Sequence, residues 1–475
     1  MKSFVHLFVF LAMLFFVWLG FSSQSHAGGE DGVQHHLIAR YVPQHPQNLT
    51  DLWGKPLYTL LSFPFAQFGF KGSLLFNILA GIFVAWLTFL SAKKLKLKFA
   101  FLSIVFLLFA PEYFYNIPSA VTEITFSMVL IGSVYLLLCE KPIWSAFLIS
   151  LIPYARTEGN AMLPLFALAF IFLKNYKALP FLLTGSLLLS LGGFFYYRDI
   201  FWIWNQHPYG DASSIYGSGS FWHYYAYAKF IWGIPLIIII SLSSLLFAGK
   251  LFKNISRKHE ITQNHWVWTF AIFGSFYVYL FGHSYVWWKG VSASLGLIRV
   301  MAGTMPLAAL IALLGLNQIL SVFNPKLKVM HGIIALGFVY LVFQSCFMIH
   351  RKLPFSGDEE RKLILEAGDW YRNSDFYPAN KVYYFAPSVA DAFLVDPFSS
   401  QRGYLESALQ ELPSMSEKTL IVWDGHFGPN ECRLPKDSLL NQPNLKLIAR
   451  FKPQSEIKSL NEHSYEILLF LKEKP

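Results

Sequence analysis

The chain has 475 residues, of which 55% are hydrophobic and only 14% are charged, whereas a typical soluble domain carries about 25% charged residues. This composition excludes an ordinary water-soluble globular protein. The net charge of +10 does not predict nucleic acid as a partner, because the basic residues are spread over short gaps between apolar runs.

Roughly eleven apolar runs precede residue 353, and a membrane span needs about 20 mostly apolar residues. The first run could be a secretory signal, since the small residues Ser25 and Ala27 suit a signal peptidase. We favour a retained span, because this run is longer than the core of a usual signal. The predicted spans cover residues 4–21, 74–91, 99–111, 120–138, 142–154, 160–173, 179–196, 228–248, 266–282, 302–322 and 329–348.

The gaps between spans differ in their content of Lys and Arg. Basic residues gather in alternate gaps, at 93–98, 141, 174–177, 250–258 and 326–328. The positive-inside rule places these gaps in the cytoplasm, so the first outward loop, at about 23–73, faces the other side. An odd number of spans that starts inside ends outside. We therefore predict a multi-pass protein of the plasma (inner) membrane, with a membrane domain at 1–349 and a soluble extracytoplasmic domain at 350–475.

The last 126 residues, 350–475, have a different pattern from the spans. Short apolar runs of β-prone residues at 381–385, 419–424, 446–451 and 465–470 predict strands. Segments 358–372 and 402–412 look helical. A domain of about 120 residues can bury its own core. The predicted fold class is thus a polytopic α-helical membrane protein with a small C-terminal α/β domain.

The chain has no Walker loop, dinucleotide fingerprint, HExxH or GxSxG motif at a suitable place. Its three cysteines show no metal-type spacing. Ionisable residues in outward segments therefore become the candidates for chemistry. In the first outward loop, Glu30 and Asp31 precede Val33, Leu37 and Ile38 at helical spacing, which predicts an amphipathic helix lying in the membrane interface. The two acids would either cap this helix or form a site, and flanking glycines favour a site.

Several further motifs make the chain resemble a known superfamily. They are Trp53-Gly54-Lys55-Pro56-Leu57-Tyr58, Phe63-Pro64, Pro118-Ser119 with Thr122-Glu123, Ala155-Arg156-Thr157-Glu158-Gly159, Arg299 before 301–306, and the tail segment 421–428. With the acidic pair of the first loop, this set resembles GT-C-type integral-membrane glycosyltransferases, the superfamily that includes protein O-mannosyltransferases. The resemblance is dispersed over most of the chain.

This resemblance implies transfer of a hexose, mannose as a first guess, from a polyprenyl-phosphate donor to an acceptor hydroxyl on a glycan, lipid or protein. It implies that Asp31 is the catalytic base, with Glu30 beside it. Many members carry Asp-x-Asp, Asp-Glu or Glu-x-Asp at this place, and this chain has Glu-Asp followed by glycine. The difference leaves open which acid is the base, and whether a divalent cation (Mg or Mn) is held by Asp31, Glu30 and His35.

The residue types fit the same chemistry. A positioned carboxylate that takes the hydroxyl proton contributes about 10²–10⁴-fold to a rate. The departing phosphate gains negative charge, which nearby cations would stabilise. The candidates for phosphate binding are Arg299, Lys289, Arg156 and His283.

Each candidate has a structural alternative. Arg299 could snorkel from a span end, although its apolar surroundings make an unpaired charge expensive there and favour a phosphate partner. Lys289 follows two tryptophans and could belong to an interfacial aromatic belt. Arg156 and Glu158 could pair with Glu123 or with each other, and we expect both acids to support the cations instead of touching substrate.

Two other functional classes compete with the transferase. One is a carrier or flippase of a lipid-linked sugar, but carriers tend to place charges at mid-span, where this chain has almost none. The other is a non-catalytic subunit that keeps the fold, which the presence of both Glu30 and Asp31 disfavours.

Overall fold

The computed structural model describes residues 2–206, 217–256, 262–291, 294–323, 327–349, 352–458 and 464–473. The basic gap residues at 257–258 and 326 lie outside this part of the chain. The protein divides into two compact units, of which unit 1 comprises Met1–Gly28 and Gln47–Phe355 and unit 2 comprises Gly29–Pro46 and Ser356–Pro475. The sequence places the boundary at 350, close to the observed one. Segment Gly29–Pro46, which the sequence groups with the membrane domain, belongs to unit 2 instead.

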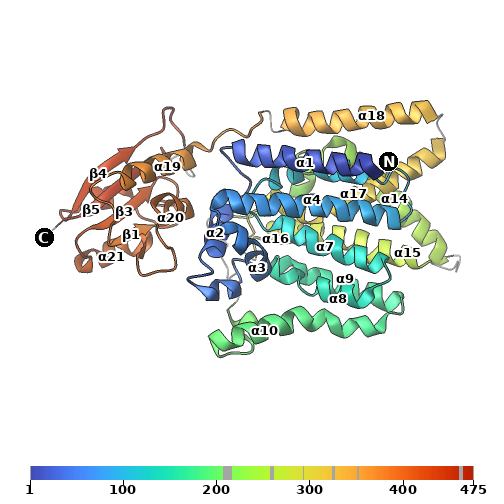
Figure 1. The fold of residues 1–475 in the computed structure, drawn as a ribbon, viewed down its shortest axis with the longest axis horizontal. Helices are drawn as coiled ribbons and strands as arrows, with labels where there is room; N and C mark the ends of the chain where they lie inside the picture. Colours follow the sequence, from blue (N-terminus) through green and yellow to red (C-terminus); the bar gives the residue numbers. More distant parts are fainter. Residues whose placement is uncertain are drawn as a thin grey trace. The chain divides into compact units, whose positions relative to one another are not determined.

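Unit 1 is made of helices (Figure 1). Its longer helices are α1 Lys2–Ser22, α4 Phe70–Lys94, α7 Glu123–Leu138, α10 Thr184–Tyr197, α14 Ile234–Ser256, α16 Ser275–Lys289, α17 Met305–Phe323 and α18 Leu327–Phe343. Its shorter helices are α3 Pro56–Ala66, α5 Leu102–Leu108, α6 Pro111–Asn116, α8 Pro142–Ile149, α9 Met162–Phe172, α11 Trp202–Asn205, α12 His223–Ala226, α13 Ala228–Ile231 and α15 Gln263–Trp266. Tighter or wider turns form η1 Pro46–Thr50, η2 Ile152–Tyr154, η3 Thr157–Ala161, η4 Tyr176–Leu183, η5 Val267–Gly274, η6 Ile298–Thr304 and η7 Gln344–Ile349.

Every predicted span contains helix, but the helices differ in length. Within the described residues, five helices are long and apolar enough to cross a membrane: Phe4–Ser22, Phe70–Lys94, Tyr176–Tyr197, Ile234–Asn254 and Ile298–Val322. Four further apolar helices are shorter, at Glu123–Leu138, Pro142–Tyr154, Thr157–Phe172 and Ile334–Cys346. The chain is thus a multi-pass membrane protein, while the count of about eleven spans stays a prediction.

Helix α4 is central to the packing of unit 1. It contacts α1, α3, α5, α7 and α17, and 61% of its most apolar window is buried, against 22% for α1. Buried small and apolar residues along α4, such as Gly81 and Ala85, let these neighbours approach. On α1, Phe16 and Leu19 are buried, and the Phe16 ring lies 5.3 Å from the ring of Phe114. Helix α4 therefore organises the core, and α1 covers one side of it (Figure 1).

Unit 2 contains a five-stranded mixed sheet in the order β2-β1-β3-β5-β4. The strands are β1 Lys381–Tyr384, β2 Arg402–Tyr404, β3 Thr419–Asp424, β4 Leu445–Phe451 and β5 Ile467–Lys472. Strand β1 pairs in parallel with β2 and β3, and β5 pairs in antiparallel orientation with β3 and β4. All residues of β3 are buried, because it is the middle strand of the sheet. The remaining elements are α2 Gly29–Arg40, α19 Glu359–Arg372, α20 Pro387–Phe393, η8 Leu405–Ser407, α21 Ala408–Glu411, η9 Leu412–Ser414 and α22 Lys436–Leu440.

The predicted helix at 402–412 is wrong at its start. Residues Arg402–Tyr404 form the edge strand β2, in which Arg402 pairs with Val382 of β1. Helical turns begin only at Leu405. Pairing with a neighbouring strand here outweighs the local helical pattern, which a sequence window does not reveal.

The amphipathic helix predicted in the first outward loop exists as α2, but it is not a free interfacial helix. It packs against α20 within unit 2. Its apolar residues Val33, Leu37 and Ile38 are buried, and the histidines between them, His35 and His36, are buried as well. The helix is therefore enclosed by its own unit on more than one face.

Candidate functional site

A cluster of ionic side chains lies in unit 1, at the ends of several helices. The Nη1 atom of Arg156 lies 2.7 Å from Oε1 of Glu123, and its Nη2 atom lies 2.8 Å from Oε1 of Glu158. The Nε atom of Arg299 lies 3.3 Å from the same Oε1 of Glu123. One carboxylate thus lies between two guanidinium groups. The structure brings together Arg156, Arg299, Glu123 and Glu158, as expected from their outward positions.

The local chain conformation explains this convergence. Glu123 is the first residue of α7, Arg156 and Glu158 belong to the turn at η3, and Arg299 lies in η6. Helix α7 contacts both η2 and η6, which brings an α-helix next to two 3₁₀ helices. Thr122 adds a hydrogen bond, since its Oγ1 accepts from Arg156 at 3.2 Å. Arg156 thus pairs with both acids, which the sequence left open as an alternative, and its binding of phosphate stays a prediction.

Burial makes this cluster unusual. The side chain of Glu123 is 1% exposed, and those of Arg156 and Arg299 are 13% and 17% exposed. Replacing a buried ion pair by well-packed apolar residues is often neutral, or stabilising by about 1–4 kcal/mol. Stability alone therefore does not account for two guanidinium groups and two acids gathered in a largely apolar unit. Such concentrations of buried charge are typical of functional sites.

His283 joins the cluster from α16. Its Nε2 atom lies 3.6 Å from Oε1 of Glu158. The ring of Tyr279 lies 4.5 Å from the His283 ring, and the ring of Tyr224 lies 6.1 Å from it. These rings place an aromatic surface next to the charged groups.

Lys55 is a member of this region that we did not select as a site residue. Its Nζ donates to Oγ1 of Thr157 at 3.3 Å and to the carbonyl oxygen of Leu52 at 3.2 Å. The side chain is buried, and this burial lowers the pKa of Lys55 to about 8, while Glu158 raises it. Its backbone φ of 61° lies in the left-handed region, which is uncommon for a residue with a side chain. A lysine between Gly54 and Pro56 in a largely apolar segment was the available signal.

Lys289 is placed differently from the other predicted cations. It is exposed at the end of α16, and its Nζ lies 3.9 Å from the centroid of the Trp288 ring. This cation–π contact fits the aromatic-belt interpretation of Lys289.

The predicted acids of the first loop belong to unit 2. Both carboxylate oxygens of Glu30 accept hydrogen bonds from Ser388, one from its amide at 2.7 Å and one from its hydroxyl. Ser388 is the second residue of α20, where backbone amides have no partner within the helix. Glu30 therefore caps α20 and holds α2 against it. Burial raises the pKa of Glu30 to about 7, and the hydrogen bonds from Ser388 act in the opposite direction.

Further contacts hold the segment after Glu30 in unit 2. The Nη1 atom of Arg40 lies 3.7 Å from Oδ1 of Asp391, and Nε2 of His45 lies 2.8 Å from Oδ2 of Asp396. Burial lowers the pKa of His36 to about 3, so this imidazole is neutral at physiological pH. Asp31, next to Glu30 in α2, is partly buried.

The expected metal ligands Asp31, Glu30 and His35 do not form an evident cation site. Both oxygens of Glu30 already accept from Ser388. Across the residues that the structure describes, no group of three or more His, Cys, Asp or Glu side chains is placed to hold a metal ion. The divalent cation therefore stays a prediction.

Comparison with known proteins gives matches at the level of structure. No protein-family model matches the sequence, and no curated protein matches it. The fold is similar to that of ArnT from Cupriavidus metallidurans in the apo state, with a TM-score of 0.65 and 10% identity over 98% of each chain. The same enzyme bound to undecaprenyl phosphate matches with a TM-score of 0.61 over the same shares.

A second solved protein matches as well. The Archaeoglobus fulgidus oligosaccharyltransferase tethered with an acceptor peptide has a TM-score of 0.58 and 11% identity, over 90% of this chain and 70% of that one. ArnT and the oligosaccharyltransferase are both GT-C glycosyltransferases. The chain has a GT-C-type fold. The resemblance found in the sequence is thereby confirmed for the fold, which is all that a likeness at these identities shows.

Proposed function

We propose that the protein is a glycosyltransferase that moves a hexose from a polyprenyl-phosphate donor to an acceptor hydroxyl, on the extracytoplasmic face of the plasma membrane. The acceptor would be a glycan, a lipid or a protein, and mannose is the first sugar to test. Asp31 is the proposed general base. The GT-C-type fold and the apolar helices support this class of reaction.

The observation that carries the proposal is the buried ionic cluster of unit 1. Arg156 and Arg299 both pair with the Glu123 carboxylate. The Nη2 atom of Arg156 also pairs with Glu158. Guanidinium groups recognise phosphate well, because their planar donors match its oxygens. The fold's likeness to ArnT bound to undecaprenyl phosphate supports a lipid-phosphate ligand.

The proposed step balances as follows. The acceptor oxygen attacks the anomeric carbon, the bond from that carbon to the phosphate oxygen breaks, and the electron pair leaves with the polyprenyl phosphate. The hydroxyl proton passes to the carboxylate of Asp31. Glu30 accepts two hydrogen bonds from Ser388, so we assign it to holding α2. Asp31 keeps the role of base that the resemblance implies.

The cations would act on the leaving group. Each well-placed donor to a developing negative charge is worth about 3–4 kcal/mol. Arg156 and Arg299 are the main candidates, with Lys55 and His283 beside them, and the acids Glu123 and Glu158 would orient the guanidinium groups. Lys289, over the Trp288 ring, is the weakest of the predicted phosphate ligands.

The test uses the full chain in membranes supplied with a polyprenyl-phosphate mannose. Asp31→Asn should lower transfer by about 10²–10⁴-fold, the usual worth of a general base. Donor binding, measured separately, should change little. Glu359→Gln is the matched control, because Glu359 is a half-exposed acid of the same unit, 4.0 Å from Lys362.

Three outcomes would count against the proposal. Unchanged turnover in Asp31→Asn would remove Asp31 as the base. Equal losses in Asp31→Asn and Glu359→Gln would indicate a general effect of charge. Movement of labelled donor between leaflets without transfer to any acceptor would favour the carrier.

A further inference from the structure

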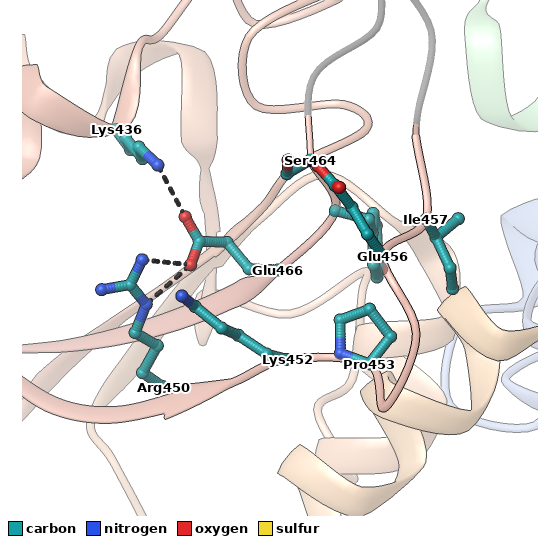
Figure 2. A pocket seen from close by; sticks show the side chains of 9 residues that line it. Lys436, Arg450, Lys452, Pro453, Glu456, Ile457, Ser464 and Glu466 are labelled. Carbon is teal, nitrogen blue, oxygen red and sulfur yellow. Dashed lines mark hydrogen bonds and ion pairs between the residues drawn. The ribbon is translucent and has the colours of Figure 1, made fainter.

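Unit 2 contains a pocket that the proposed transfer reaction does not use (Figure 2). Its volume is about 370 Å³, which lies in the range of small-molecule sites, about 300–1,000 Å³. It lies between the end of β4, the start of α22 and the chain leading into β5. The lining residues are Lys436, Arg450, Lys452, Pro453, Glu456, Ile457, Ser464, Tyr465 and Glu466.

Three cations surround one acid in this pocket. The Glu466 carboxylate accepts from Nζ of Lys436 at 2.8 Å and from Nε of Arg450 at 2.6 Å. Figure 2 shows the Lys452 side chain extending beside this group. The other acid, Glu456, accepts from the Ser464 hydroxyl at 2.7 Å. The lining thus carries three positive charges against two negative ones, and the three cations gather around Glu466.

The charge balance predicts the class of ligand. Lys436 and Arg450 are 42% and 45% exposed, so each can turn part of its donors toward a bound group. Basic side chains grouped in a concave site recognise phosphate through charge-assisted hydrogen bonds.

The rest of the lining suits a group larger than phosphate. Pro453, Ile457 and Tyr465 provide apolar surface, and Glu456 and Ser464 provide groups that can bond to hydroxyls. The amide of Tyr465 donates to the carbonyl oxygen of Ile457 at 2.9 Å and so joins the two segments that carry these residues. Apolar surface beside hydroxyl-binding groups is typical of sites for sugars.

We propose that this pocket binds a phosphorylated sugar, with the phosphate on Lys436, Arg450 and Lys452 and the sugar ring against the apolar wall. The ligand could be a soluble sugar phosphate or the headgroup of a phosphorylated glycolipid, which share this chemistry. The proposal is independent of the transfer reaction, because it concerns binding alone.

The test measures binding of glucose 1-phosphate to the full chain in detergent, by calorimetry or by its ³¹P signal, with inorganic phosphate and glucose as separate probes. Glucose 1-phosphate should bind more tightly than either. Lys452→Gln should weaken it about tenfold, the worth of one charge-assisted hydrogen bond. Lys446→Gln is the matched control, because Lys446 lies on β4, the strand that leads into Lys452, is 64% exposed and pairs with Glu473 at 3.5 Å.

Several results would overturn the proposal. Equal affinity for inorganic phosphate and glucose 1-phosphate would show that the sugar is not recognised. Equal losses of affinity in Lys452→Gln and Lys446→Gln would indicate unspecific attraction by positive charge. Absence of binding to the soluble probe and to vesicles that contain a phosphorylated glycolipid would remove the site. Binding to the vesicles alone, lost in Lys452→Gln, would support the glycolipid as the source of the ligand.

Discussion

Each unit of the molecule places one buried carboxylate between two cations, and the surroundings of the two groups differ. In unit 1, Glu123 is 1% exposed, and its partners Arg156 and Arg299 are 13% and 17% exposed. In unit 2, Glu466 is 4% exposed, but Lys436 and Arg450 are 42% and 45% exposed. The acids are alike, and the cations of unit 2 are far more exposed to solvent than those of unit 1.

The exposure of the cations determines how much each buried carboxylate contributes to the stability of the fold. A cation that loses its partner while buried keeps an uncompensated charge, which destabilises a fold by about 3–5 kcal/mol. An exposed cation turns to water instead, and such pairs are worth about 0–1 kcal/mol. The same arrangement is therefore structurally critical in unit 1 and nearly neutral in unit 2, where the cations are free to bind another anion.

The largest effect is expected for Glu123→Gln. It removes the charge shared by Arg156 and Arg299 and should lower the free energy of unfolding by about 3–5 kcal/mol. Thermal unfolding of the purified protein in detergent measures this change. A decrease in the free energy of unfolding of less than about 1 kcal/mol would show that these guanidinium groups behave like exposed ones. The two units would then not differ in the way proposed.

A smaller effect is expected for Arg299→Gln, because Arg156 still neutralises Glu123. The variant removes only the ion pair between Nε of Arg299 and Glu123, at 3.3 Å, so the loss of stability should be smaller than the about 3–5 kcal/mol expected when a buried charge loses all its partners. Arg299→Lys should restore the charge and part of the stability. Transfer activity separates this from a purely structural role, since Arg299→Lys should remain slower than wild type if the planar guanidinium binds phosphate. Full activity in both variants would remove Arg299 from the phosphate site.

Sequence reasoning identified the members of the ionic cluster but not its geometry. Glu123, Arg156, Glu158 and Arg299 are rare charges at span ends, so burial and pairing could be anticipated from their cost in an apolar setting. Which atoms meet depends on the packing of α7 against η2 and η6, which no local pattern encodes. The strand at 419–424, by contrast, could be predicted from its apolar run, because a middle strand is buried on both faces.

The assignment of α2 to unit 2 was out of reach for the same reason. Its main anchor joins Glu30 to Ser388, two residues separated by 358 positions in the chain. Helical spacing indicated the helix and its apolar face, but the partner of that face is α20, a short helix whose role emerges only in the folded unit. The strand β2 was missed because its pairing with β1 also joins residues outside a local window, as Val382 and Arg402 show.

Glu30 provides a third type of buried acid, held by an amide and a hydroxyl of Ser388. Its folded-state pKa is raised from 4.5 to about 7. The unfolded chain therefore releases this proton at lower pH than the folded one, and stability should fall as pH rises from about 4.5 to 7. Glu30→Gln should reduce this slope, measured as unfolding temperature at pH 5 and pH 8, whereas Glu359→Gln should leave it unchanged. An unaltered slope in Glu30→Gln would place the titration elsewhere.

The smallest effect is expected for Glu466→Gln in unit 2, with a change of about 0–1 kcal/mol in stability at neutral pH. Burial acts to raise the pKa of Glu466, but the hydrogen bonds from Lys436 and Arg450 outweigh it, and the pKa is lowered from 4.5. The group therefore adds stability above pH about 4.5 that is lost as the pH falls through its folded-state pKa. Unfolding temperatures of wild type and variant should converge at low pH. If Glu466→Gln lost as much stability at neutral pH as Glu123→Gln, the exposure of the cations would not determine how much the acid between them contributes to stability.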